Sequence, residues 1–141
     1  MRALGIDLGS KRIGIAVSDI SGTVASALTT VHRSKSRRHD HAEIAQLVRT
    51  EECEMVVVGL PLSLDGTHGP AAKRAVTEAK QLASVVGVPV EMHDERFTTV
   101  TAERGMLEAG LDARQRRQVV DKVAAAVMLQ AWLDHRKGTA G

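Results

Sequence analysis

The sequence contains one cysteine, one phenylalanine, one tryptophan and no tyrosine among 141 residues. A single cysteine, Cys53, excludes an internal disulfide framework and a zinc site built from cysteines. Phe97 and Trp132 are too few to form a platform on which single-stranded bases stack. Any nucleic acid that this chain binds is therefore expected to be held through its backbone and shape.

Long apolar runs are also missing, and none approaches the roughly 18 residues of a membrane span. The first residues contain no apolar region typical of a signal peptide, so we expect a cytoplasmic protein with no membrane partner. Apolar residues make up 43% of the chain and charged residues 26%, which is typical of a globular protein. We predict one domain over residues 1–137, with residues 138–141 as a disordered tail.

The net charge is only +2, but the basic residues gather in three short stretches. These stretches are residues 32–39, 114–117 and 135–137. Such clusters suit the phosphate backbone of a nucleic acid. Taken one at a time, each is equally typical of a solvated surface, and the sequence leaves both interpretations open.

Hydrophobic patterning predicts alternating strands and helices after an initial meander of three strands. The predicted strands are 2–8, 13–18, 24–31, 54–60 and 88–93, and the predicted helices begin after Asp40 and cover 70–86, 98–108 and 114–135. Asp40 with Glu43 three residues later is typical of a helix N-cap. A right-handed crossover then places the fourth strand parallel to the first, which indicates an α/β fold.

Acidic residues stand where the parallel strands end, and ligands of such sheets bind at this edge. Asp7 lies in a buried strand, where an unpaired charge is costly, so a functional role is favoured. The alternative is a carboxylate that caps the following turn at Ser10 or Lys11. Asp94 and Glu95 end the fifth strand, and strand periodicity does not choose between them.

Asp121 opens a helical run that is apolar on nearly every side. Its neighbours on the same face are Ala124, Ala125 and Met128, so this carboxylate is not simply solvated. The alternative is a salt bridge to Lys122 or to an upstream arginine. The alanines would let the helix approach the sheet closely and bring Asp121 toward the strand ends.

Carboxylates from two strand ends and a helix repel one another unless a cation lies between them. Mg²⁺ or Mn²⁺ prefers such oxygen ligands and binds substrate phosphates at its open positions. One or two such ions would activate water and stabilise charge on phosphorus, which favours metal-dependent hydrolysis of phosphodiesters.

Other catalytic chemistries find little support. His39 and His41 lack the spacing of a metal-binding motif, and we interpret them as solvated loop residues. No serine stands in a Gly-x-Ser-x-Gly pattern. Cys53 lies between Glu52 and Glu54, where acidic neighbours raise the pKa of a thiol and make it a poor nucleophile.

Four segments together resemble the YqgF/RuvX family of small bacterial proteins with an RNase H-like fold. They are residues 5–16 (GIDLGSKRIGIA), 58–62 (VGLPL), 94–99 (DERFTT) and 121–125 (DKVAA). Members of this family are described as Holliday junction resolvases and as nucleases that mature the 5′ end of 16S ribosomal RNA.

The resemblance implies a mixed five-stranded sheet in the order 3-2-1-4-5, with strand 2 antiparallel and helices on both faces. It also implies that Asp7, Glu95 and Asp121 are the catalytic residues and the ligands of Mg²⁺ or Mn²⁺, which selects Glu95 over Asp94. One departure concerns the fourth strand. Related resolvases often place an acid at its end, and this chain has Gly-Leu-Pro there.

We therefore expect an endonuclease for structured nucleic acid that processes the 5′ end of the 16S rRNA precursor in ribosome biogenesis. Lys11, Arg12 and Arg96 would position phosphates, although the first two also suit a solvated turn. An rRNA nuclease could act as a monomer. One alternative is a homodimeric resolvase of DNA four-way junctions, and the other is a non-catalytic ribosome assembly factor. Residues 7–17 also resemble the first phosphate loop of sugar kinases, but those enzymes clamp ATP between two such domains.

Overall fold

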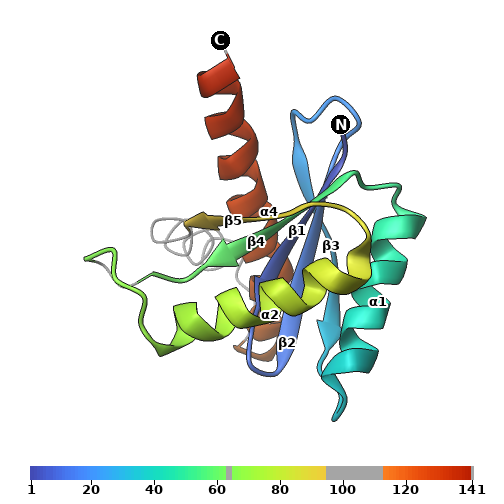
Figure 1. Ribbon diagram of the computed structural model, residues 1–141, viewed down its shortest axis with the longest axis vertical. Helices are drawn as coiled ribbons and strands as arrows, with labels where there is room; N and C mark the ends of the chain where they lie inside the picture. The colour runs from blue at the N-terminus through green and yellow to red at the C-terminus, as the bar shows by residue number, and fades with distance from the viewer. Residues whose placement is uncertain (63–64, 95–112, 141) are drawn as a thin grey trace.

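In the computed structural model, residues 1–62, 65–94 and 113–140 are described, and for 113–121 and 137–140 only the helical backbone is described. Five strands form one mixed sheet (Figure 1). They are β1 (Ala3–Leu8), β2 (Arg12–Ser18), β3 (Ala25–His32), β4 (Met55–Leu60) and β5 (Val90–Asp94). Three helices pack on the sheet, α1 (Arg37–Thr50), α2 (Pro70–Val86) and α4 (Ala113–Ala140).

The strand order is β3-β2-β1-β4-β5, as predicted. β2 runs antiparallel to both of its neighbours, and β1, β4 and β5 are parallel. α1 and α2 cover one face of the sheet and α4 covers the other (Figure 1). The predicted α/β architecture with helices on both faces is therefore confirmed.

The turn between β1 and β2 depends on Gly9. Its N–H donates to the carbonyl oxygen of Arg12 at 3.0 Å, and a Cβ at Gly9 would lie only 2.4 Å from that oxygen. No other residue fits this turn without moving the backbone. The turn sets the register of the hairpin, in which Asp7 pairs with Gly14.

α1 begins three residues earlier than the predicted Asp40 cap. The N-cap is Ser36, whose hydroxyl accepts a hydrogen bond from the His39 N–H at 3.1 Å. Asp40 lies inside the helix and is buried, and its carboxylate accepts hydrogen bonds from the N–H and hydroxyl of Ser34. The prediction was wrong because this carboxylate folds back on the preceding loop rather than onto the next turn of the helix.

α2 begins and ends as the sequence predicts. Pro70 occupies its first turn, and Gly87 ends it in the left-handed conformation with φ of 73°. α4 includes the predicted helix 114–135, and the predicted helix 98–108 lies outside the described residues. No helix in the described part of the chain is long and apolar enough to cross a membrane.

α4 packs close to β1 because the strand presents a glycine to the helix. A Cβ at Gly5 would lie 2.9 Å from the Cβ of Leu129 and 3.3 Å from the carbonyl oxygen of Ala125. At the other end, the Arg136 guanidinium lies 3.5 Å from the sulfur of Met1. α4 therefore runs antiparallel to β1, and its N-terminal part extends toward the end of β1.

Candidate active site at the carboxyl ends of the strands

Asp7 is the next-to-last residue of β1 and is half-buried. Strand alternation puts it on the face of Ala3 and Gly5, which is the face covered by α4. Its neighbour on β2 is Gly14, and the register of β1 with β4 makes Gly59 its neighbour on the other side. Both glycines are buried, so this part of the sheet is covered, and neither contributes a side chain next to the Asp7 carboxylate.

His93 of β5 pairs with Gly59 and occupies the same level of this face. Burial lowers the pKa of His93, with His135 lowering it further and Asp94 opposing the shift. The lowered pKa favours the neutral imidazole. Across the sheet, Asp7 of β1, Gly59 of β4 and His93 of β5 lie at the same level.

Asp121 belongs to the part of α4 of which only the backbone is described. It precedes Ala125 by four residues, or about 6 Å along the helix axis. Asp7 follows Gly5 by two residues, or about 6.7 Å along the strand. Because Ala125 packs on Gly5 and the two elements are antiparallel, the backbone at Asp121 lies toward the same end of β1 as Asp7.

The other predicted acid falls at the end of β5. Asp94 pairs with Leu60 and alternates with Val90 and Met92, which pack into the core under α1 and α2. Asp94 therefore belongs to the opposite face from Asp7. Glu95 and Arg96 lie outside the described residues. Of the three predicted carboxylates, only the Asp7 side chain is therefore described. Among the side chains that are described, no three His, Cys, Asp or Glu form a metal site.

Lys11 and Arg12 lie at the same edge of the sheet as Asp7, in and just after the β1–β2 turn. The Lys11 side chain is exposed and its carbonyl oxygen accepts the Arg33 N–H at 2.9 Å. Arg12 is half-buried and begins β2 opposite His32. Both cations thus stand near the end of β1, and their contact with phosphates stays a prediction.

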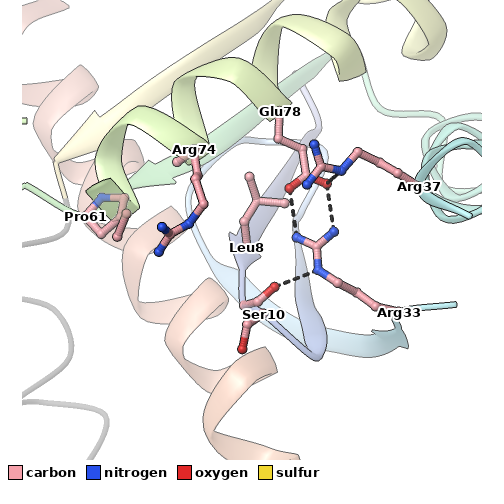
Figure 2. A pocket seen from close by; sticks show the side chains of 10 residues that line it. Leu8, Ser10, Arg33, Arg37, Pro61, Arg74 and Glu78 are labelled. Carbon is pink, nitrogen blue, oxygen red and sulfur yellow. Dashed lines mark hydrogen bonds and ion pairs between the residues drawn. The ribbon is translucent and has the colours of Figure 1, made fainter. Parts of the chain in front are cut away.

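A buried ionic cluster on the other face was not predicted. Glu78 of α2 is 3% exposed, and the two terminal nitrogens of Arg33 bind its carboxylate oxygens at 2.9 and 2.8 Å. The Nε of Arg33 donates to the carbonyl oxygen of Gly9 at 2.7 Å (Figure 2). His41 Nε2 lies 2.7 Å from the same carboxylate. His41 is 4% exposed, so its interpretation as a solvated loop residue was wrong.

Electrostatics within this cluster favour charged groups. Burial opposes ionisation of Glu78, but hydrogen bonds from Arg33 and His41 and the charge of Arg37 outweigh it and lower the pKa of the carboxyl. The hydrogen bonds to Glu78 raise the pKa of Arg33. The sequence did carry a signal, because Glu78 follows Ala75 by three residues and precedes Leu82 by four, which places it on the buried face of α2.

The family described as "RuvX: Holliday junction resolvase" matches residues 1–135. The chain belongs to the RuvX family. All four segments that carry the resemblance lie inside the matched region. The name of the family and those of its relatives indicate a nuclease, a hydrolase of phosphodiester bonds.

Two relatives of this RuvX-family chain are named "Putative pre-16S rRNA nuclease". The protein of Anaeromyxobacter dehalogenans is 49% identical over 136 residues, which cover 96% of this chain and 98% of the relative. The protein of Myxococcus xanthus is 48% identical over 137 residues, covering 96% and 90%. Among solved structures, Thermus thermophilus RuvC in complex with a Holliday junction substrate aligns with a TM-score of 0.59 at 22% identity. That alignment covers 99% of this chain and 98% of RuvC, and it shows a shared fold.

Proposed function

We propose that this protein is an endonuclease that hydrolyses phosphodiester bonds in structured RNA and processes the 5′ end of the 16S rRNA precursor. The observation that carries the proposal is the setting of Asp7, a carboxylate at a strand end between Gly14 and Gly59. Neither position adds a side chain beside the carboxylate, which favours binding of a phosphate and its counter-ion there. The names of the RuvX-family relatives support the choice of substrate.

The proposed site consists of Asp7, Glu95 and Asp121. The backbone path of α4 toward the end of β1 supports Asp121, and the location of Asp94 on the opposite face supports Glu95 as the acid from β5. Three carboxylates fit Mg²⁺ or Mn²⁺, since hard oxygen ligands are what these ions prefer. The bound ion would supply an activated water and neutralise charge on the phosphate.

The chain itself supplies orientation and charge. Asp7 fixes one oxygen ligand on a strand that is hydrogen-bonded on both sides and does not move independently of the sheet. Lys11, Arg12 and Arg96 would hold the phosphates that flank the scissile bond and stabilise their negative charge. A cytoplasmic location stays a prediction that accords with an rRNA substrate.

Cleavage of precursor 16S rRNA by the purified chain tests the proposal. With Mg²⁺ or Mn²⁺ the wild type is expected to cut near the mature 5′ end, and EDTA is expected to abolish cleavage. Asp7→Asn, Glu95→Gln and Asp121→Asn should each lower the rate by about 100-fold or more. Asp94→Asn is the matched control from the other face of the sheet and should keep the wild-type rate. Equal rates for Asp7→Asn and the wild type would refute the site.

A second function is favoured by the name of the family and by the fold shared with RuvC. Resolution of a DNA four-way junction requires two sites related by a two-fold axis, hence a dimer. Symmetric nicks in a synthetic junction, made by a species of dimer mass in sedimentation, would establish this function over RNA processing. Binding of precursor rRNA with no cleavage of either substrate would instead indicate an assembly factor.

A further inference from the structure

A cleft of about 280 Å³ opens on the α1 and α2 side of the sheet, next to the end of β1. Its polar lining comes from the β1–β2 turn, the loop after β3, the start of α1 and the first half of α2: Ser10, Arg33, Arg37, Arg74 and Glu78. Leu8 also lines it, and Leu8 directly follows Asp7 in β1. The cleft and Asp7 therefore lie on opposite faces of the same strand end.

The cleft has an excess of positive charge. Three arginines face it with one carboxylate, Glu78, and that carboxylate is already bound by both terminal nitrogens of Arg33. Arg37 is about half exposed and lies 3.8 Å from Glu78, too far for a good hydrogen bond. In the described part of the chain Arg74 has no ion pair, and its side chain leaves α2 and lies between Pro61 and Leu8 in the view of Figure 2.

One wall of the cleft is held rigidly. Arg33 joins the Gly9 carbonyl oxygen to Glu78, so the β1–β2 turn is tied to α2. His41 fixes the same carboxylate from α1. These contacts explain Arg33, Glu78 and His41 as structural residues. They leave Arg74 unexplained. Arg37 adds its charge near Glu78 and donates to the Gln81 side-chain oxygen at 3.3 Å, but its side chain stays about half exposed.

We propose that this cleft binds backbone phosphates of the nucleic-acid strand whose scissile bond lies at Asp7, an inference that rests on the proposed function. Arg37 and Arg74 are the contacting residues, since guanidinium groups bind phosphate through two parallel hydrogen bonds. Ser10 adds a hydroxyl, and Arg33 and Glu78 are positioning residues. The strand then passes around the ends of β1 and β4, with its phosphates held on both faces.

Binding is measured separately from cleavage. The full chain carrying Asp7→Asn is titrated into a fluorescein-labelled fragment of precursor 16S rRNA, and anisotropy gives the affinity at several KCl concentrations. Arg37→Ala and Arg74→Ala are each expected to weaken binding about tenfold. Each should also lower the slope of log affinity against log salt by about 1.

Arg49→Ala is the matched control, because Arg49 is an exposed arginine at the far end of α1 and loses the same charge. Weaker binding and smaller salt slopes for Arg37→Ala and Arg74→Ala alone support the cleft, even if the wild type cuts no substrate and the proposed function fails. Equal affinities for all three variants would overturn the cleft while leaving cleavage at Asp7 intact. If the chain binds no RNA, and inorganic phosphate alone shifts the NMR signals of Arg74, the cleft is not a binding site for a nucleic-acid strand.

Discussion

The two faces of the sheet are packed with residues of different size. The face under α1 and α2 buries large aliphatic side chains, among them Leu4, Ile6, Ile13, Ile15 and Val58. On the face under α4 the sheet contributes mainly small residues, Ala3, Gly5 and Ala16, and the large side chains come from the helix: Met128, Leu129, Trp132 and Leu133. Large residues keep the helices at a distance and exclude water, whereas small residues let a helix backbone approach a strand directly.

The two faces also differ in how their carboxylates are buried and bound. On the aliphatic face, Glu78 is enclosed, and its carboxylate is bound by Arg33 and His41 from two other segments. No buried side-chain polar atom among the described residues lacks a hydrogen-bond partner. On the small-residue face, Asp7 is half-buried beside two glycines at the edge of the sheet. The first arrangement stabilises the fold, and the second leaves a half-buried carboxylate at a strand end, where we propose that a ligand binds.

The largest expected effect on stability comes from Glu78→Ala. It leaves the part-buried Arg33 charge and the buried His41 ring without their partner and should lower the free energy of unfolding by about 3 kcal/mol. Urea denaturation checks this value. The control is Glu43→Ala, which removes an exposed pair with His39 and should cost at most about 0.5 kcal/mol.

A paired replacement sharpens the same comparison. Arg33→Met combined with Glu78→Leu removes both charges and should recover much of the lost stability. If the double variant is no more stable than Glu78→Ala, the cost does not arise from an unpaired buried charge.

Gly5→Ala tests the close packing of α4. The added methyl group would lie 2.9 Å from the Leu129 Cβ, so the helix must move, and the free energy of unfolding should fall by about 1–3 kcal/mol. Ile6→Val, on the other face at the next position, deletes a methyl group instead and should cost about 0.5–1.5 kcal/mol. Thermal denaturation of both variants measures the difference, and an unchanged melting temperature for Gly5→Ala would show that α4 is not in close contact.

Acid should destabilise the aliphatic face first. The pKa values of Glu78 and Asp40 are lowered in the folded state, so in acid the unfolded chain binds more protons than the folded one. Their stabilising contribution is complete above the ordinary pKa of 4.5 for Glu and 3.8 for Asp and is lost as the pH falls through the lowered values. Urea denaturation between pH 3 and pH 6 should show this decline. Asp40→Asn should show a shallower decline, and an identical pH profile would contradict the assignment.

The smallest effect concerns Cys53, which is buried in the core under α1 and α2. Burial raises the pKa of the thiol to about 11, with Glu51 raising it and Arg2 opposing the shift. At pH 8 only about one molecule in a thousand carries a thiolate, so a thiol reagent should label the folded protein slowly. The chain unfolded in guanidinium is the control and should react at once. Rapid labelling of the folded protein would place the thiol at the surface.

Local patterns were sufficient for the strands and for the ends of α2. The continuous apolar run of β4, the short turn at Gly9, and Pro70 with Gly87 are signals that act within a few residues. The cap of α1 was predicted wrongly because the prediction chose Asp40, whereas Ser36, four residues earlier, caps the helix. Ser34 binds Asp40 and removes it from capping.

The sequence by itself determined the α/β architecture, the hairpin and the location of Asp7 at the end of a buried strand, because periodicity and turn chemistry are local properties. Only the tertiary structure decided that His41 and Arg33 meet at Glu78, that Gly14 and Gly59 flank Asp7, and that Arg37 and Arg74 share a cleft. These residues are far apart in the chain, and their juxtaposition follows from strand order and helix packing. No local pattern encodes such distances.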